Sequence, residues 1–257
     1  MLRFKSLGSG SSGNATLVQS AGASLSNVLI DCGFGLKQMV QRLEKSGVLP
    51  EQLDAIFITH EHGDHTGCVQ ALSNQYKIPV WMSAGTASAM GFDDTLSLLR
   101  TASDGDVIAL NGLQLTAFTV PHDARQPLQL TCTDGASKLG VLTDLGHATA
   151  HVLNHLQGCH ALVLECNHDA GMLAASVYPP FLKVRIGGDY GHLANSQSAQ
   201  IARHVLHSGL KHVVAAHLSQ QNNLPDVVKA TLAEALSCQS DDIIIATQAD
   251  GFAWLDV

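Results

Sequence analysis

The chain has 257 residues, of which 46% are hydrophobic and 14% are charged, and its formal net charge is −8. This balance excludes a disordered chain and disfavours a broad nucleic-acid-binding surface, which would need many Lys and Arg side chains. No apolar run reaches the roughly 18 to 20 residues of a membrane span, and no sustained apolar segment follows the basic start at Met1–Gly8, so we expect a cytoplasmic protein without membrane association.

The first part of the chain predicts short strands that alternate with helices. Apolar, β-rich runs at Asn27–Asp31, Ala55–Thr59 and Ile78–Trp81 are typical of strands, and the patterns at Leu36–Ser46 and His65–Tyr76 are typical of helices. Such alternation favours an α/β architecture.

The middle of the chain has a different pattern. Four strand-like runs follow one another with short Asn-Gly and Asp-Gly turns between them, which predicts an antiparallel meander. A strand–helix alternation returns from Ala161 to His217, so we expect two sheets between helices in one domain spanning residues 1–257. The four runs are Val107–Leu110, Leu113–Val120, Leu128–Thr133 and Leu139–Thr143.

The segment Gly8–Asn14 is rich in Gly and Ser and is similar to a phosphate-binding loop. It lacks the Gly-Lys-Ser/Thr ending of a P-loop and the spacing of a dinucleotide-binding fingerprint. Two interpretations remain open: a tight turn that joins strands at Phe4–Leu7 and Ala15–Gln19, or a wall of a substrate pocket.

The densest set of metal-ligand residues follows the apolar run Ala55–Ile58. His60 and His62 are two residues apart, so in an extended loop they point the same way and can bind one ion, while Asp64 and His65 turn toward a second. Imidazole and carboxylate ligands suit zinc, and also manganese or iron. We therefore predict two divalent metal ions.

Further candidates each follow an apolar strand, at His122, Asp144 and His217. Two cations roughly 3.5 to 4 Å apart can share a hydroxide nucleophile and stabilise the oxyanion of a phosphoryl or acyl centre. The predicted set is His60, His62 and His122 on one ion, Asp64, His65 and His217 on the other, and Asp144 bridging them.

These motifs resemble those of the metallo-β-lactamase-fold hydrolases, in particular the YycJ-like (WalJ) branch. The resemblance covers nearly the whole chain and implies a four-layer αββα sandwich, with two mixed sheets flanked by helices. It also implies that Asp31 supports the ligand loop. The segments that carry it are Leu7–Asn14, Leu29–Gly33, His60–His65, Pro121–Ala124, Thr143–Gly146, Glu165–Asp169, Leu182–Ile186, Gly191–Asn195 and His217–Asn223.

The same resemblance implies a phosphodiesterase, because that branch is associated with exonuclease action on DNA 5′ ends. We expect a metal-bridging hydroxide to attack phosphorus, with nucleic acid as the substrate. The alternatives are a small-molecule phosphodiesterase, a thioesterase-type hydrolase on the same fold, or a metal-binding module without turnover. The sequence does not predict the oligomeric state or the cleavage polarity.

His192 lies between Gly191 and a predicted helix start at Asn195, where backbone N–H groups attract phosphate. By analogy with related tRNA-processing ribonucleases, His192 binds the scissile phosphate or protonates the leaving oxygen without binding metal, while Glu165 or His168 orients it. Further substrate-binding candidates are Asn195 and two cations near it in sequence, Lys183 and Arg185.

Overall fold

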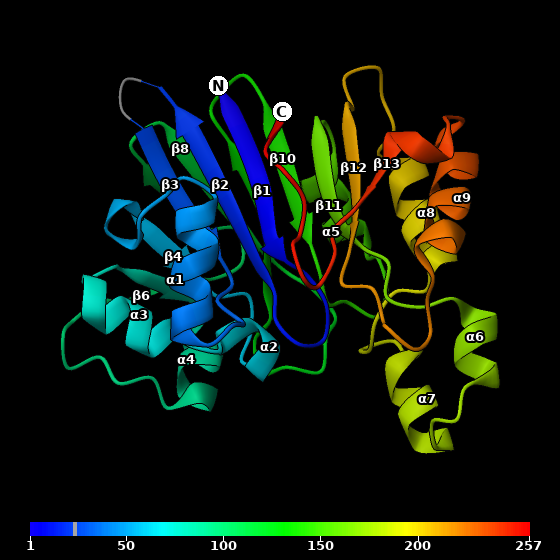
Figure 1. Ribbon diagram of the computed structural model, residues 1–257, viewed down its shortest axis with the longest axis horizontal. Helices are drawn as coiled ribbons and strands as arrows, with labels where there is room; N and C mark the ends of the chain where they lie inside the picture. Colours follow the sequence, from blue (N-terminus) through cyan, green and yellow to red (C-terminus); the bar gives the residue numbers. More distant parts are fainter. Residues whose placement is uncertain (23–24) are drawn as a thin grey trace.

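The computed structural model describes residues 1–22 and 25–257, in which two seven-stranded sheets face each other between helices (Figure 1). Both sheets are mixed, as predicted. The first has the order β14 (Leu255–Asp256), β1 (Leu2–Gly8), β2 (Ala15–Ala21), β3 (Leu25–Ile30), β4 (Ala55–Phe57), β5 (Val80–Met82) and β6 (Leu99–Thr101). The second has the order β13 (Ile243–Ile245), β12 (His212–Ala216), β11 (Ala161–Glu165), β10 (Lys138–Leu142), β9 (Leu128–Thr133), β8 (Leu113–Thr119) and β7 (Val107–Leu110).

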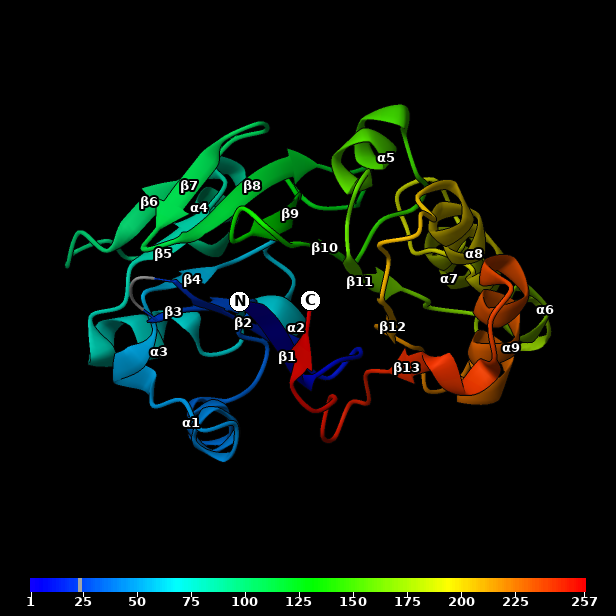
Figure 2. The same cartoon turned by 90° about the horizontal axis from the view of Figure 1, so that it is seen from above.

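Helices cover the outer face of each sheet, as the view from above shows (Figure 2). The first sheet is covered by α1 (Leu36–Lys45) and α3 (Val69–Tyr76), and the second by α5 (Ala150–Leu156), α8 (Asn195–His204) and α9 (Pro225–Leu236). The shorter elements are α2 (Gly63–Thr66), α4 (Ala84–Met90), α6 (Ala170–Ala175), α7 (Pro180–Ile186) and the 3-10 turns Pro50–Gln52 and Ser240–Asp242. No helix in the described part of the chain has the length and apolar character to cross a membrane.

Neighbouring strand residues supply different layers of the hydrophobic core, because successive side chains of a strand point to opposite faces. In β2, Leu17 packs toward the helices of the first sheet and Val18 packs between the sheets. In β4, Ile56 and Phe57 divide in the same way. A third core lies between the second sheet and its helices. Three apolar layers therefore separate the four structural layers of the predicted sandwich.

The predicted meander is confirmed, since β7, β8, β9 and β10 pair antiparallel in sequence order. The single helix predicted over His65–Tyr76 is wrong. The structure divides this segment into α2 and α3, because Gly67 has φ 17° and ψ −89° and approaches the backbone of Cys32 and Gly33. A Cβ at Gly67 would lie 2.6 Å from the carbonyl oxygen of Cys32.

Strand direction gathers the candidate residues at one edge of the molecule. β10, β11 and β12 run parallel, β8 runs in the same direction, and β3 and β4 run parallel in the other sheet. The residues that follow these strands therefore meet where the two sheets face each other, at the lower edge in Figure 1.

Candidate metal centre

Three imidazoles from two loops converge at this edge. His60 and His62 follow β4, His122 follows β8, and one ring nitrogen of each lies within 4.8 Å of the other two. His122 Nε2 is 3.4 Å from His62 Nδ1. His60 Nδ1 lies 3.0 Å from the hydroxyl of Thr59, and its Nε2 is buried without a hydrogen-bond partner in the part of the chain that the structure describes. The arrangement matches the first predicted ligand group.

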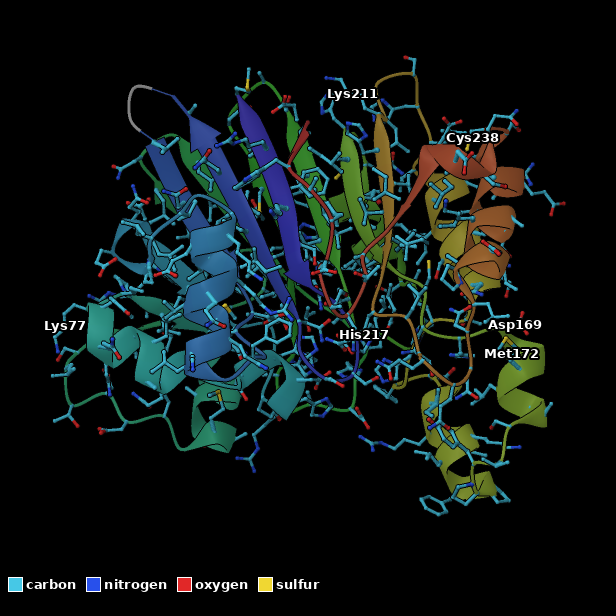
Figure 3. The ribbon with its side chains drawn as sticks, in the orientation of Figure 1. Lys77, Asp169, Met172, Lys211, His217 and Cys238 are labelled. Atoms are coloured by element: carbon cyan, nitrogen blue, oxygen red, sulfur yellow. The ribbon has the colours of Figure 1, made fainter. Side chains whose placement is uncertain are left out.

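Asp64, His65 and His217 form a second group beside the first. His217 Nε2 is 3.3 Å and His65 Nε2 is 3.5 Å from Asp64 Oδ2. The buried carboxylate of Asp144 lies 3.0 Å from His65 Nε2 and 3.4 Å from His217 Nδ1, and it also groups with His60 and His65. Asp144 therefore lies between the two groups. In Figure 3, His217 is at the lower edge of the second sheet.

The side chains that support these groups lie in two loops of the first sheet, the connection between β1 and β2 and the turn after β3. Asp31 accepts from His65 Nδ1 at 2.7 Å and from the N–H of Thr59 at 2.9 Å, which fixes the ring of His65 as the family resemblance implies. Asn14 Nδ2 lies 3.3 Å from Asp64 Oδ2, and the Ser9 hydroxyl accepts from the N–H of His217 at 2.8 Å.

Glu165 and His192 form a pair next to the second group. His192 Nδ1 is 2.7 Å from Glu165 Oε1, and Glu165 Oε2 accepts from the backbone N–H groups of Leu145 and Leu193, each at 3.1 Å. Burial would raise the pKa of Glu165, but His192 lowers it to about 2. Burial opposes a charge on His192, yet Glu165 and Asp144 raise its pKa well above the usual value. The pair is therefore an imidazolium held by a buried carboxylate.

The pKa shifts divide the ligand imidazoles into two kinds. Burial lowers the pKa of His60 and His122, so both rings are neutral at pH 7 and offer a lone pair. Burial also opposes charge on His65 and His217, but Asp144 and the other nearby carboxylates raise both pKa values, that of His217 to about 9. At these two rings, protons and cations compete for the same nitrogen.

The donor set fits two divalent cations. The unpartnered Nε2 of His60 points to a ligand outside the protein, because buried polar atoms normally have a partner. Neutral imidazoles beside carboxylates are the ligands that zinc and manganese prefer. His192 also groups with Asp144, Glu165 and His217 at ligand spacing. His192 is therefore close enough to the ligands to bind a cation itself. That it contacts substrate and does not bind metal stays a prediction.

A cavity of about 270 Å³ opens beside the two groups. Arg185 lines it and donates from Nε to Asp123 at 2.6 Å. Lys183 does not reach it, since its Nζ donates to the carbonyl of Ala174 at the end of α6, 2.6 Å away. The lining residues are Ser11, His62, Asp64, Asp123, Asp144, Arg185, Ile186, Gly191, His192 and His217.

Two predicted site residues have other surroundings. Asn195 is 2% exposed, and its amide exchanges two hydrogen bonds of 2.9 Å with Asn223, so its polar atoms are engaged inside the protein. His168 is buried, and its Nδ1 has no hydrogen-bond partner among residues 1–22 and 25–257. Of the two candidates for orienting His192, Glu165 makes the contact.

Sequence reasoning missed several supporting groups. Ser11 lines the cavity while Ser9 and Asn14 hold the ligand loops, so the Gly-rich segment Gly8–Asn14 is both a connection between β1 and β2 and a wall of the pocket. The carbonyl of Gly191 lies 3.1 Å from His122 Nδ1. Because Thr59 is next to His60 in the sequence, its contact with that ring could have been predicted. No sequence feature indicates the long-range contacts of Ser9 and Asn14.

Proteins similar in sequence to this chain include an exodeoxyribonuclease and a metal-dependent hydrolase. Residues 26–218 match the family described as the beta-lactamase superfamily domain. The exodeoxyribonuclease YycJ of Bacillus anthracis is 30% identical over 240 residues, which cover 91% of this chain and 89% of that protein.

Two solved structures share the fold. The metallo-beta-lactamase fold protein YhfI from Bacillus subtilis has a TM-score of 0.77 at 17% identity, with 99% of this chain and 98% of that chain covered. Zn(2+)-bound PqqB from Methylobacterium extorquens has a TM-score of 0.74 at 15% identity, with 99% and 100% covered. At these identities the similarity concerns the fold alone.

Proposed function

This chain is a metal-dependent hydrolase that belongs to the beta-lactamase superfamily, in the branch of the YycJ and WalJ exodeoxyribonucleases, and we propose that it hydrolyses phosphodiester bonds of DNA from 5′ ends. The proposal rests above all on His192, which lines the same cavity as the metal-ligand residues and is held from behind by the buried Glu165. A thioesterase has less need of such a pair, because a thiolate leaves without a proton, whereas the alkoxide leaving group of a natural phosphodiester benefits from one.

The residues around the cavity have three proposed roles: holding the cations, positioning a proton donor and binding phosphate. Bound divalent cations, for which zinc and manganese fit the donor set, supply Lewis acidity and lower the pKa of water. Asp64, from the ligand loop, and Asp144, between the groups, would help to hold these cations. Glu165 holds His192 Nδ1, which leaves Nε2 to bind the scissile phosphate or to donate a proton to the leaving oxygen. Arg185 at the rim can pair with a phosphate oxygen.

The direct test uses metal-loaded protein and four substrates. We expect 5′-labelled DNA to release mononucleotides or short products from the labelled end, and a chromogenic bis(nitrophenyl) phosphate to be hydrolysed. RNA and 3′-labelled DNA serve as the comparison substrates. Hydrolysis of the chromogenic ester without any nucleic-acid cleavage would contradict the DNA substrate and favour a small phosphodiester.

Replacing Asp64 tests the ligand set. Asp64→Ala should lower phosphodiester turnover by about 10² or more, because one cation loses its only aspartate from the ligand loop. Elemental analysis should show less metal per chain than in the wild type, and a thermal melt checks that the variant folds. Wild-type turnover in this variant would contradict the assignment.

Replacing His192 separates substrate binding from metal binding. His192→Ala should keep the metal content and lower kcat/KM by roughly 10² to 10⁴, the range for a lost acid or anion-binding side chain. His204→Ala, on an exposed position of α8, is the matched control. If His192 acts as an acid, a nitrophenyl ester should lose less than DNA, because nitrophenolate leaves without a proton. Loss of metal from His192→Ala would instead make His192 a ligand.

A further inference from the structure

Two cysteines flank the metal-ligand loop, and their thiols are in contact. Cys32 follows Asp31 in the turn after β3, and Cys68 is the residue before α3. The two Sγ atoms lie 3.3 Å apart, close enough for one thiol to donate a hydrogen bond to the other. Both side chains are buried, Cys32 completely and Cys68 with 6% of its surface exposed. We call these two residues the thiol pair.

The backbone at the thiol pair already has the geometry that a disulfide needs. The N–H of Cys68 donates to the carbonyl of Cys32 at 3.2 Å, so the two residues lie side by side. A disulfide joins residues whose Cα atoms are about 4.4 to 6.8 Å apart, and a hydrogen bond between two backbones places them at such a separation. Forming the bond would bring the sulfur atoms from 3.3 Å to about 2.05 Å.

The thiol pair belongs to the backbone contacts that position the metal ligands. The N–H of Cys32 donates to the carbonyl of His65 at 2.7 Å, and Asp31 accepts from the ring of the same histidine. Cys68 follows His65 by three residues, and Gly67 between them packs against the Cys32 carbonyl without space for a Cβ. Because such close packing transmits strain, a movement of either sulfur displaces the backbone that holds His65 and its acceptor.

We propose that the thiol pair is an oxidation site, at which a hydroperoxide converts Cys32 and Cys68 into a disulfide and thereby lowers the affinity of the metal centre for its cations. This inference concerns the metal centre and holds for any substrate that the centre hydrolyses.

The reaction takes two steps. The sulfur of Cys68, the more exposed of the two, attacks the peroxide, which breaks the O–O bond, forms a sulfenic acid and releases an alcohol, or water from hydrogen peroxide. The sulfur of Cys32 then attacks the sulfur of Cys68, and hydroxide leaves as water with the thiol proton. The two thiols lose two electrons in total, and the peroxide gains them.

Bound metal and oxidation oppose each other. Because the disulfide form binds cations more weakly, bound cations favour the dithiol form by the same factor. The metal-loaded protein is thus protected, and the metal-free chain is the form that a peroxide oxidises.

Peptide mapping tests whether the bond forms. The protein used is Cys238→Ala, since Cys238 is the one of the six cysteines that is not buried, and Figure 3 shows it near the end of α9, away from His217. The metal-free protein is treated with tert-butyl hydroperoxide, alkylated and cleaved with trypsin. Cys32 and Cys68 fall in the peptides 6–37 and 46–77, each of which contains one cysteine, so a disulfide joins these peptides into one species.

We expect the joined peptides, the loss of two free thiols per chain, and the return of both thiols after dithiothreitol. Circular dichroism should show that the oxidised protein stays folded. Peroxide treatment that leaves Cys32 and Cys68 free, or oxidises them without joining the peptides, would overturn the oxidation site.

Affinity for Mn²⁺ tests the coupling to the metal centre. After removal of the peroxide, calorimetric titration should show a Kd about tenfold higher or more in the oxidised protein than in the reduced protein, the effect that residues supporting a metal site have. The matched variant is Cys68→Ala/Cys238→Ala, which cannot form the bond. Its Kd should stay within about twofold of that of the reduced protein, before and after peroxide.

The reduction potential of the thiol pair gives an independent measurement. In glutathione buffers with saturating Mn²⁺, the potential should be higher than without metal, by about 30 mV for each tenfold difference in Kd. A disulfide that leaves both the Kd and the potential unchanged would overturn the coupling. An equal loss of Mn²⁺ affinity in peroxide-treated Cys68→Ala/Cys238→Ala would also overturn it, because the damage would then lie outside the thiol pair.

Discussion

At the scale of single residues, three members of the metal centre have left-handed backbone. Asp31, Asp144 and His217 have φ of 62°, 55° and 55°, although none is a glycine. Each follows closely on the end of a strand, at β3, β10 and β12 respectively. This conformation is uncommon for side chains with a Cβ and persists where the surroundings enforce it. Here it turns each side chain out of the strand direction and toward the ligands.

Asp31 acts through His65, so its removal should be felt as lost metal affinity. Asp31→Asn keeps the shape and the tolerance for positive φ but weakens the acceptor of the His65 Nδ1 proton. We expect metal affinity to fall roughly 10- to 100-fold, measured by competition with a chelator. Asp54→Asn is the matched control, since Asp54 accepts from the N–H of Asn27 in the same half of the molecule. Equal affinity in both variants would show that Asp31 does not support the site.

The raised pKa of His217 predicts how metal binding depends on pH. Burial lowers this pKa, but Asp144, Asp64 and Glu165 together raise it to about 9. Below that pH the ring is protonated and cannot bind a cation, so binding must release the proton. Apparent affinity for Mn²⁺ should therefore increase as the pH rises toward 9 and level off above it.

Calorimetric titration at pH 7.5 in two buffers of different ionisation enthalpy measures the protons released. We expect one or more per chain. An affinity that stays constant between pH 6.5 and 9 would contradict the assignment of His217 as a ligand.

At the scale of elements, the ligand loop between β4 and α3 is held by close backbone contact with the turn after β3. A Cβ at Gly33 would lie 1.7 Å from the carbonyl oxygen of Asp64, where no side chain fits. The N–H of Cys32 also donates to the carbonyl of His65 at 2.7 Å. The position of Asp64 and His65 thus depends on a turn that lies about thirty residues earlier in the chain.

Two glycines near this contact give a matched pair of substitutions. Gly33→Ala must displace the ligand loop, so we expect a loss of stability of about 3 kcal/mol or more and loss of metal. Gly63→Ala adds a Cβ in open space, with nothing within 4 Å, and should bind metal like the wild type. Denaturant unfolding and elemental analysis of both variants check this. Similar behaviour of the two would mean that the contact is not tight.

The ligand loop also shows how far sequence reasoning reaches. His60, His62, Asp64 and His65 were predictable because their spacing and the preceding apolar strand are local features. The break at Gly67 was not, because its cause is the approach of Cys32 and Gly33 in the folded chain. Local pattern therefore predicts ligands and strands, but not the contacts that shape a loop.

The same distinction applies to the residues predicted around His192. A helix start at Asn195 was predictable, and the structure begins α8 there. That its side chain pairs with Asn223 depends on another loop 28 residues away, to which no periodicity points. Lys183 was an equally ambiguous candidate, since a lysine on a short helix can extend to a substrate or to the end of a neighbouring helix.

At the scale of the whole molecule, the metal centre joins the two sheets. His60, His62, Asp64 and His65 follow a strand of the first sheet, and His122, Asp144 and His217 follow β8, β10 and β12 of the second. Cations bound here therefore connect two layers that otherwise meet through apolar packing between their inner faces.

Metal loading should therefore stabilise the folded chain. At a free metal concentration of 100 times Kd, the stabilisation is about 2.7 kcal/mol, which for a domain of this size raises Tm by roughly 5 to 11 °C. Calorimetry with added Zn²⁺ or Mn²⁺, against a chelator, measures the shift. Asp64→Ala should show a smaller shift than the wild type, and an identical Tm with and without metal would contradict a cation between the sheets.

The order of the ligands along the chain has a consequence during synthesis. His60, His62, Asp64, His65, His122 and Asp144 all leave the ribosome before His217, and Ser9 cannot bond to the backbone of His217 until then. A nascent chain thus presents an incomplete ligand set, with little power to discriminate between cations that imidazole and carboxylate both accept. The full ligand set, and with it full discrimination among metals, is therefore available only once His217 has been synthesised. The metal that a cell leaves in this protein therefore depends on which cations are free in the compartment at that moment, as well as on the ligands.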